Sequence, residues 1–569
     1  MSDFKKLPQP KRRQIIQAAI AVSGVGLFSN RISAATTPYS YSYGGSVQPP
    51  ATTPFVELLP VFAPKMPVAA LNPPAQEFAA VGEAGRDPHQ RWNTFPPVKF
   101  YQLQVVESTH SFHRELPSQP IWGYDGTLPG PTFVARVGEP IVIRFNNMLS
   151  NTAYGFGSPE ISTHLHNGHV ASESDGYAGN YYSATKFGPT LSRAGAFYDN
   201  HYPNCYSRFD TSPSTNGDSR EGLGTMWYHD HREGFTAANV YRGLAGFYLM
   251  FDDIDSGNEN DTNLKALRLP SGVGKYDIPL MLTDPSFDSS GMRVFDQFDA
   301  DGFLGNKFCV NGKIQPTFSV ARRKYRFRLL DGSPARFYEL YLTKSNVDQS
   351  FTYIANDGNL LPAPLTLSKI RLAPAERGDI VIDFSKYAIG SQLFLENRLV
   401  QTSGRGPDGV QTPGVPLLRF TVDSEAADNS RVPPTLRALA PINTAAVTVN
   451  RSFFFDKRNG SWLVNGATFD VLNPAFTVKK GATEIWTLRG SWGWHHPIHI
   501  HMEEGRILSR NGVAPPPEEA GRKDVFVLNP NDEVKVLIRF GDFMGKYMMH
   551  CHNTVHEDHA MMLRFDIIA

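Results

Sequence analysis

The sequence predicts an all-β protein, and three observations support this fold class. The chain contains 48 glycines and 43 prolines, aromatic residues make up 12% of it, and long amphipathic helical patterns are missing. Frequent turn residues between short alternating apolar stretches are typical of sandwiches and barrels. Hydrophobic residues make up 41% of the 569 positions, enough to fill the cores of about three or four domains. The formal net charge of zero indicates neither a nucleic-acid partner nor an anionic membrane surface.

One local pattern occurs three times. It is a Pro, then an aromatic or apolar position, a basic or Gly turn, and alternating apolar residues, in "GPTFVARVGEPIVIRFNN" (130–147), "KIQPTFSVARRKYRFRLLD" (313–331) and "LNPAFTVKKGATEIWTLRG" (472–490). Each copy predicts a strand, a turn and a second strand. Recurrence at intervals of about 160 to 185 residues predicts three copies of one β domain.

Connectors rich in Asp, Asn, Ser and Pro place the domain boundaries near residues 255 and 435. We therefore expect β domains at 93–255, 256–435 and 436–569. A Pro-rich stretch at 36–92 is predicted to be a linker that wraps the first domain.

The first 35 residues have the organisation of an export signal. A basic group precedes an apolar run and then small residues: Lys11, Arg12 and Arg13, then Ile15 to Phe28, then Ser33, Ala34 and Ala35. The run is too short to span a bilayer comfortably, so we expect cleavage and a periplasmic or secreted protein. The Arg12–Arg13 pair indicates the twin-arginine route, although the surrounding consensus is only partly met. An uncleaved anchor or an ordinary basic terminus is the alternative.

Histidines carry the strongest functional signal. The chain has 17, and four short motifs contain the His-x-His spacing: His164 and His166, His229 and His231, His499 and His501, and His550 and His552. On a strand, residues i and i+2 project from the same face, so each pair can reach one metal cluster. One such pair is weak evidence, but four pairs in one chain predict a shared metal site.

Parity predicts a second site on the other side of the same strands. In "HCHNTVHEDHAMM", Cys551 points away from His550 and His552, and His496 has the opposite parity to His499. Cys551 and His496 can therefore meet, with His556 and Met561 in the adjoining turn or helix. One Cys, two His and a distant Met are the ligands of a blue-copper electron-transfer site.

The remaining eight imidazoles suit three copper ions. Zinc is the rival metal, because it also accepts imidazole. A zinc hydrolase, however, usually adds a bridging carboxylate and does not require an adjacent thiolate–methionine site. The combination favours copper.

These motifs, their order and their placement toward the two ends of the chain resemble the multicopper oxidases. The resemblance covers nearly the whole chain after the linker and implies three cupredoxin-like Greek-key β-sandwich domains and four coppers: one type 1, one type 2 and two type 3. It makes His496, Cys551, His556 and Met561 the type 1 ligands and His164 and His499 the type 2 ligands. The implied type 3 ligands are His166, His229, His231, His501, His550 and His552. With no ligand position missing, the resemblance implies oxidation of a donor at the type 1 copper and four-electron reduction of dioxygen to water at the trinuclear cluster.

Within the family, the likeness is greatest to the bacterial spore-coat laccase and bilirubin oxidase branch. "WHHPIHIH", with Trp494, and "HCHNTVHEDHAMM" look like bilirubin oxidase motifs, whereas "HLHNGHVASESDGY" looks like the spore-coat form. His169 departs from the pattern, and we expect it to support the site or the fold rather than to bind copper. Glu557 and Asp175 match positions that help move protons to the cluster in the resembled enzymes. A hydrogen bond that holds the Glu557 loop, or a turn capped by Asp175, is the structural alternative.

The two remaining cysteines and one long segment complete the predictions of structure. We expect a disulfide between Cys205 and Cys309 in an exported protein, with two free buried thiols as the alternative. The stretch from Tyr177 to Phe209 has no ligand spacing and is predicted to be a covering loop.

For the electron donor, the sequence leaves three hypotheses. Trp492, Trp494 and His495 lie near a type 1 ligand and favour a flat aromatic donor, such as a phenol, an aromatic amine or a bilirubin-like tetrapyrrole, although these tryptophans can also simply pack. A metal oxidase acting on Mn(II) or Cu(I) is the second hypothesis, and a copper-sequestering protein without turnover is the third. We expect dioxygen and the donor as small-molecule partners of a monomer that has no nucleic-acid partner and no membrane span after signal cleavage.

Overall fold

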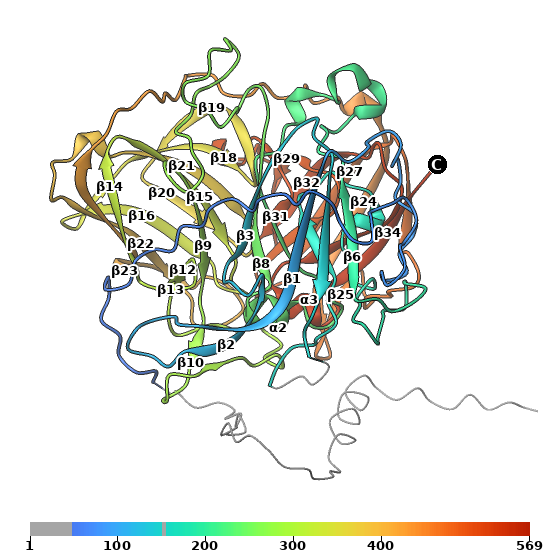
Figure 1. Cartoon of the computed structure of the whole chain (residues 1–569), viewed down its shortest axis with the longest axis horizontal. Coiled ribbons are helices and arrows are strands. Elements are labelled where there is room, and N and C mark those ends of the chain that lie inside the picture. The colour runs from blue at the N-terminus through green and yellow to red at the C-terminus, as the bar shows by residue number, and fades with distance from the viewer. Residues whose placement is uncertain (1–47, 151–154) are drawn as a thin grey trace, which may run out of the picture. The chain divides into compact units, whose positions relative to one another are not determined.

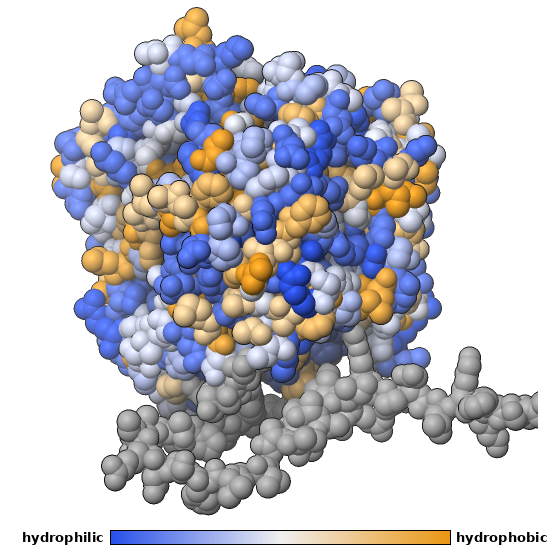
Figure 2. All heavy atoms as spheres, turned by 45° about the vertical axis from the view of Figure 1, so that its right-hand side comes forward, coloured by the Kyte–Doolittle hydropathy of each residue, from blue (hydrophilic) through white to orange (hydrophobic). Residues whose placement is uncertain are grey.

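The computed structural model describes residues 48–150 and 155–569. The predicted export signal at 1–35 therefore lies outside the described residues, as does the first part of the predicted linker. In the described part of the chain, no helix is both long and apolar enough to cross a membrane. On the face drawn in Figure 2, hydrophobic residues lie in small groups among hydrophilic ones.

The first section of the chain forms two four-stranded sheets, with the strand orders β2-β1-β4-β6 and β3-β8-β7-β5 (Figure 1). The strands are β1 (Lys99–His110), β2 (Gln119–Tyr124), β3 (Gly130–Arg136), β4 (Ile141–Asn147), β5 (Thr163–His166), β6 (Phe197–Tyr202), β7 (Thr225–Asp230) and β8 (Ala245–Phe251). Helix α2 (Thr236–Arg242) connects β7 to β8. Buried aromatic and aliphatic residues of both sheets, among them Trp122 and Tyr228, form one core.

The middle section forms a seven-stranded sheet, β13-β12-β9-β15-β21-β18-β19, and a six-stranded sheet, β14-β23-β22-β16-β17 with β20 paired to β16. The first comprises β9 (Asp277–Thr283), β12 (Cys309–Val310), β13 (Lys313–Ile314), β15 (Lys324–Asp331), β18 (Phe351–Asn356), β19 (Asn359–Leu367) and β21 (Arg377–Asp383). The second comprises β14 (Thr317–Arg322), β16 (Tyr338–Lys344), β17 (Val347–Gln349), β20 (Lys369–Leu372), β22 (Gln392–Val400) and β23 (Gly409–Glu425). A separate hairpin joins β10 (Ser286–Phe287) and β11 (Arg293–Val294).

The last section forms the sheets β25-β24-β27-β32-β29-β30 and β26-β34-β33-β28-β31. The first comprises β24 (Val447–Arg458), β25 (Ser461–Val464), β27 (Thr483–Gly490), β29 (Gly505–Arg510), β30 (Arg522–Lys523) and β32 (Glu533–Arg539). The second comprises β26 (Phe476–Lys479), β28 (His496–Ile500), β31 (Val525–Leu528), β33 (Gly545–Cys551) and β34 (Met562–Ile568). Helix α3 (Thr554–Asp558) connects β33 to β34.

The three sequence repeats have the same topology, so the predicted strand–turn–strand units are confirmed. They are β3–β4, β14–β15 and β26–β27, and in each the two strands belong to different sheets. The first strand pairs in parallel with the last strand of its section, β8, β23 or β34. The second strand pairs in parallel with the opening strand, β1, β9 or β24. Each repeat is therefore the point at which the chain passes from one layer of a sandwich to the other, as the all-β prediction requires.

The described part of the Pro-rich stretch contacts all three sections of the chain. Isolated bridges join Pro64 to Thr132, Glu83 to Phe197, and Leu58 to Thr317 of β14. Asp87 pairs with Lys546 of the last section at 3.0 Å. The stretch therefore contacts the middle and last sections as well as the first, whereas the sequence predicted contact with the first alone. The predicted covering loop also differs, because its residues Phe197–Tyr202 form the edge strand β6.

Candidate metal centres

Two pairs of strands carry the His-x-His motifs. In the first section, β5 pairs with β7, which sets His164 opposite His229. In the last section, β28 pairs with β33, which sets His499 opposite His550. The second histidine of each motif follows on the same face, and all eight are buried: His164, His166, His229, His231, His499, His501, His550 and His552. Strand alternation thus presents four imidazoles from each end of the chain.

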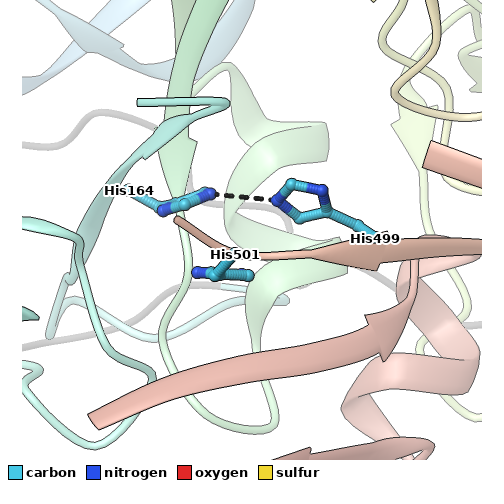
Figure 3. A group of neighbouring side chains, drawn as sticks. All are labelled: His164, His499 and His501. Carbon is cyan, nitrogen blue, oxygen red and sulfur yellow. Dashed lines mark hydrogen bonds between the residues drawn. The ribbon is translucent and has the colours of Figure 1, made fainter. Parts of the chain in front are cut away.

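The two sets of imidazoles meet. His164 Nε2 lies 3.4 Å from His499 Nε2, and Figure 3 shows these rings facing each other with His501 beside them. His550 Nε2 lies 3.2 Å from Nε2 of both His231 and His501. The ligand atoms of three histidine groups lie within 4.8 Å of one another: His164, His499 and His501; His164, His166 and His229; and His231, His501 and His550. The predicted convergence of distant histidines is present.

Hydrogen bonds at Nδ1 orient most of these rings. The Nδ1 atoms of His164, His229 and His499 contact the backbone carbonyls of Asp175, Asp230 and Asp524. His501 Nδ1 lies 2.7 Å from Asp175 Oδ2. A ring whose Nδ1–H donates to oxygen presents its Nε2 lone pair to the cluster.

His166 is held in the opposite orientation. Its Nε2 lies 2.9 Å from the Asp524 carboxylate, which is fully buried and ion-paired with Arg377. Neither ring nitrogen has a hydrogen-bond partner among the described residues. The carboxylate beside Nε2 leaves Nδ1 of His166 as the nitrogen available to a metal, where its neighbours offer Nε2. Asp524 was missed by sequence reasoning, since nothing in "GRKDVFVL" marks a residue whose partner lies on β5.

The buried setting suits metal ions. Burial lowers the pKa of His166, His229, His499, His501 and His552 well below the usual value, and neighbouring imidazoles lower it further. The rings are therefore neutral and can act as ligands at neutral pH. The Nε2 of His229 and both ring nitrogens of His552 have no hydrogen-bond partner, although they are buried. Buried polar atoms are rarely left without partners, so these residues fit a metal cluster.

The thiol site lies on the other side of the same strands. Cys551 Sγ lies 3.6 Å from Nδ1 of His496 and 3.6 Å from Nδ1 of His556, and all three residues are completely buried. The Cys551 N–H donates to the carbonyl of Met561 at 3.1 Å, so the methionine is adjacent. Burial raises the pKa of the Cys551 thiol, so its thiolate requires a cation such as a metal ion. These four residues fit a copper with one thiolate and two imidazoles.

Trp462, which sequence reasoning did not single out, packs against His556 with the two rings tilted by 32°. The ring centroids are 3.8 Å apart, and the indole Nε1–H donates to the Ala300 carbonyl. His556 Nε2 lies 3.0 Å from the carbonyl oxygen of Asp301. The residues next to this ligand thus include a buried tryptophan and the loop around Asp301.

The two predicted proton carriers contact the histidine cluster. Glu557 Oε2 lies 3.0 Å from His550 Nδ1, and its Oε1 lies 3.4 Å from His231 Nδ1. Burial favours the protonated form of Glu557, but His550 and His231 outweigh it and hold the pKa of this carboxyl below its ordinary value. The next residue, Asp558, accepts hydrogen bonds from two backbone amides at the start of α2, which anchors α3 and with it Glu557.

His169 and the free thiols lie apart from the ligand groups. His169 Nε2 lies 2.8 Å from Asp542 Oδ2, and its Nδ1 lies 3.6 Å from Glu503. This ion-paired position agrees with a supporting role. The predicted disulfide is wrong: Cys205 and Cys309 are both free and buried. They belong to different hydrophobic clusters, so neither thiol has the other within reach.

Comparison with known proteins identifies the family. Residues 105–191 and 433–568 match family profiles described as multicopper oxidase. The chain is 35% identical over 481 residues to the bilirubin oxidase of Albifimbria verrucaria, a match that covers 82% of this chain and 76% of that protein. The chain belongs to the multicopper oxidase family.

Other relatives of this multicopper oxidase support the same family assignment. The laccase of Bacillus subtilis (strain 168) is 31% identical over 536 residues, covering 84% of this chain and 96% of the laccase. The crystal structure of McoA multicopper oxidase from Aquifex aeolicus matches with a TM-score of 0.68 and 26% identity, over 84% of this chain and 97% of that one. A laccase from Pediococcus acidilactici, at 23% identity, has the same fold with a TM-score of 0.71 over 93% and 97% of the two chains.

Family membership confirms the predicted fold class and chemistry. The multicopper oxidase has cupredoxin-like sandwiches and catalyses copper-dependent oxidation coupled to reduction of dioxygen. Membership of this family implies copper, and the structure contains histidine clusters of the kind that can hold it.

Proposed function

We propose that this multicopper oxidase binds four copper ions in two centres and oxidises phenolic or other aromatic donors as a laccase or a bilirubin oxidase does. The type 1 ligands are His496, Cys551, His556 and Met561. The type 2 ligands are His164 and His499, and the type 3 ligands are His166, His229, His231, His501, His550 and His552. Seven imidazoles converge behind a separate thiol site, and the ring of His552 lies 5.4 Å from that of His229. This convergence of eight imidazoles carries the proposal.

Copper at both centres supplies one-electron redox chemistry, and the protein provides the connection between them. Cys551 is covalently joined to His550 and His552, whose side chains point to the opposite side of β33. The sequence His-Cys-His is thus a short path from the type 1 site to the trinuclear site. Glu557 and Asp175, held against His550 and His501, are the groups that we assign to proton delivery during reduction of dioxygen to water.

An aromatic donor is supported by the surface near His556. Trp492 is 79% exposed. Trp494 packs edge-on against Trp462, with ring centroids 5.4 Å apart, and the Arg405 guanidinium lies 4.8 Å from the centroid of the Trp494 ring. Trp462 in turn packs against His556. A flat donor at Trp494 would therefore be separated from a type 1 ligand by one aromatic ring, that of Trp462.

The same surface is less suited to a metal donor. The Asp301 carboxylate pairs with Lys457 at 2.6 Å and with Arg405 at 3.2 Å. Both cations therefore neutralise the side chain of a residue whose backbone carbonyl contacts His556. A site for Mn(II) or Cu(I) would require uncommitted carboxylates or thioethers. This pairing favours the organic donor over a metal oxidase, which remains the second candidate.

Turnover with three donors tests the proposal. The copper-loaded protein is assayed in the steady state with bilirubin, 2,6-dimethoxyphenol and Mn(II), while oxygen consumption is followed. We expect kcat/KM to be highest for the two organic donors. Faster turnover of Mn(II) would support the metal oxidase, and copper binding without oxygen consumption would support a copper-sequestering protein.

We also propose that the protein is exported and acts outside the cytoplasm as a monomer. The basic, apolar and small-residue segments at 1–35 support export, and Arg12–Arg13 supports the twin-arginine route. Fractionation of cells, followed by determination of the N-terminal residue, tests both export and cleavage.

A further inference from the structure

A cavity lies over the outward face of the last section. Its volume is about 340 Å³, within the range of about 300–1,000 Å³ that small-molecule sites occupy. Its lining includes Thr483 of β27, Leu537 and Arg539 of β32, and Arg506 of β29. The connector contributes Ala440, Pro441, Ile442, Asn443 and Ala446. Neither Trp494 nor Arg405 lines it. The cavity is therefore separate from the surface that we assign to the electron donor.

The inner wall adjoins the histidine cluster. Asn167 directly follows His166, and its amide donates to the carboxylate of Glu504 at 2.7 Å. Met502, which also lines the cavity, directly follows His501. A ligand in this cavity would thus contact the segments that carry two of the metal-binding motifs.

The carboxylates that line the cavity already have cationic partners. Glu221 lies 3.2 Å from Arg522 and 3.4 Å from Arg208. Glu504 is ion-paired with the same Arg522, and Glu503 lies 3.6 Å from His169. Each of these carboxylates is thus paired with a cation other than Arg506 or Arg539.

Among the described residues, two lining arginines have no carboxylate within ion-pair distance of their side chains. The Arg506 guanidinium donates to the carbonyl of Ala440 at 3.2 Å, and its Nε is buried without a partner there. Arg539 pairs with Thr483 through its backbone, but its guanidinium makes no hydrogen bond or ion pair with another described residue. Burial and the neighbouring Arg522 lower the pKa of Arg506, and Glu221 offsets only part of this effect.

Strand register brings the two free guanidinium groups to one place. Arg506 is paired with Leu537 between β29 and β32, and Arg539 is two residues beyond Leu537 on the same face. Such diagonal positions lie about 7–8 Å apart at the backbone, within reach of long side chains. Two like charges this close, in a half-buried setting, are unfavourable unless an anion lies between them.

We propose that this cavity binds a divalent oxyanion, either phosphate or a dicarboxylate, through the guanidinium groups of Arg506 and Arg539. Planar guanidinium groups form paired, charge-assisted hydrogen bonds with both kinds of oxyanion. The two uncompensated charges set the preferred ligand charge at two. Asn443 and Ser207, which also line the cavity, supply further polar contacts.

Calorimetric titration of the full copper-loaded protein tests the site. Phosphate and succinate are titrated separately in a chloride buffer of constant ionic strength, so that general screening is the same throughout. The variants are Arg506→Gln and Arg539→Gln. The matched control is Arg489→Gln, because Arg489 lies on the same face of β27 as Thr483 but pairs with Glu533 and does not line the cavity.

We expect one equivalent of anion to bind, with affinity about tenfold weaker or more in each cavity variant and unchanged in the control. Binding of phosphate alone or of succinate alone would identify the source of the oxyanion. Absence of saturable binding to the wild-type protein by both anions would overturn the proposal. Equal weakening of anion binding in the Arg489 variant would also overturn the proposal. The loss of affinity would then reflect the net charge of the protein and not this cavity.

Discussion

Glu557 Oε2 lies 3.0 Å from Nδ1 of His550, and the Glu557 side chain also reaches His231, which comes from the other end of the chain. One buried carboxylate therefore contacts imidazoles of two different sections. A group in this position can orient both rings, move protons toward the cluster, or do both.

Replacement of Glu557 by Gln separates these roles. Gln retains the size of the side chain and a carbonyl acceptor but cannot carry a proton. We expect steady-state turnover to fall roughly 10- to 100-fold, with reoxidation by dioxygen slowed more than dye oxidation in anaerobic single-turnover experiments. Unchanged copper content is the control for ligand geometry. Equal slowing of both half-reactions would point to a structural role.

Replacement of Cys551 by Ser tests the electron path. We expect the intense blue absorption and the oxidase activity to be lost, because a hydroxyl does not form the copper–thiolate bond. The fold should be retained, since the side chain differs by one atom and the surrounding core of Trp462, Ile498 and Phe526 is unchanged. Far-ultraviolet circular dichroism and metal analysis measure both properties. Activity at the wild-type level would refute the proposed route.

Much of this arrangement could be predicted because it depends on neighbouring residues. The opposite parity of His496 and His499, and of Cys551 and His550, follows from strand geometry alone. The turn residues likewise predicted all three strand–turn–strand units. What the local pattern could not predict was that each unit joins two different sheets, because sheet membership depends on distant pairing.

Features that depend on distant partners were missed or wrong. Asp524 acts on His166 across the interface of two sections, and Trp462 reaches His556 through packing, so neither has a sequence signal. The disulfide prediction failed for the same reason. Two cysteines in an exported chain do not reveal their separation, and the fold places Cys205 and Cys309 in different cores.

Arg405 provides a test of donor recognition. Its guanidinium lies over Trp494 and is 55% exposed, so it can contact a carboxylate of bilirubin, whereas 2,6-dimethoxyphenol carries none. We expect Arg405→Gln to raise KM for bilirubin roughly three- to tenfold with kcat nearly unchanged, because an exposed ion pair contributes about 1 kcal/mol. KM for the phenol should stay the same. Arg489→Gln is the charge-matched control, and an equal rise in KM for both donors would contradict direct recognition of the carboxylate.

His169 gives a prediction about stability and pH. Burial disfavours its charged form, but Glu503 and Asp542 outweigh this effect and raise the pKa of His169 from 6.5 to about 9. Because the folded pKa lies above the unfolded one, the charged ring stabilises the fold fully below about pH 6.5, and this contribution is lost as the pH rises through about 9. We expect His169→Gln to lower the free energy of unfolding by roughly 2–3 kcal/mol at about pH 6 and by much less at about pH 10.

Differential scanning calorimetry of the wild type and the variant across this pH range measures the difference in Tm. The matched control is His110→Gln, because burial lowers the pKa of His110, whose Nε2 lies 2.7 Å from the Gly312 carbonyl. A histidine whose pKa is lowered by folding has the opposite pH dependence. The stability that wild-type His110 confers relative to Gln increases as the pH rises through the ordinary pKa of histidine. The difference in Tm between wild type and variant should therefore decrease with rising pH for His169→Gln and not for His110→Gln. If the Tm difference for His169→Gln is constant from about pH 6 to about pH 10, the ring stabilises the fold through packing and not through its charge.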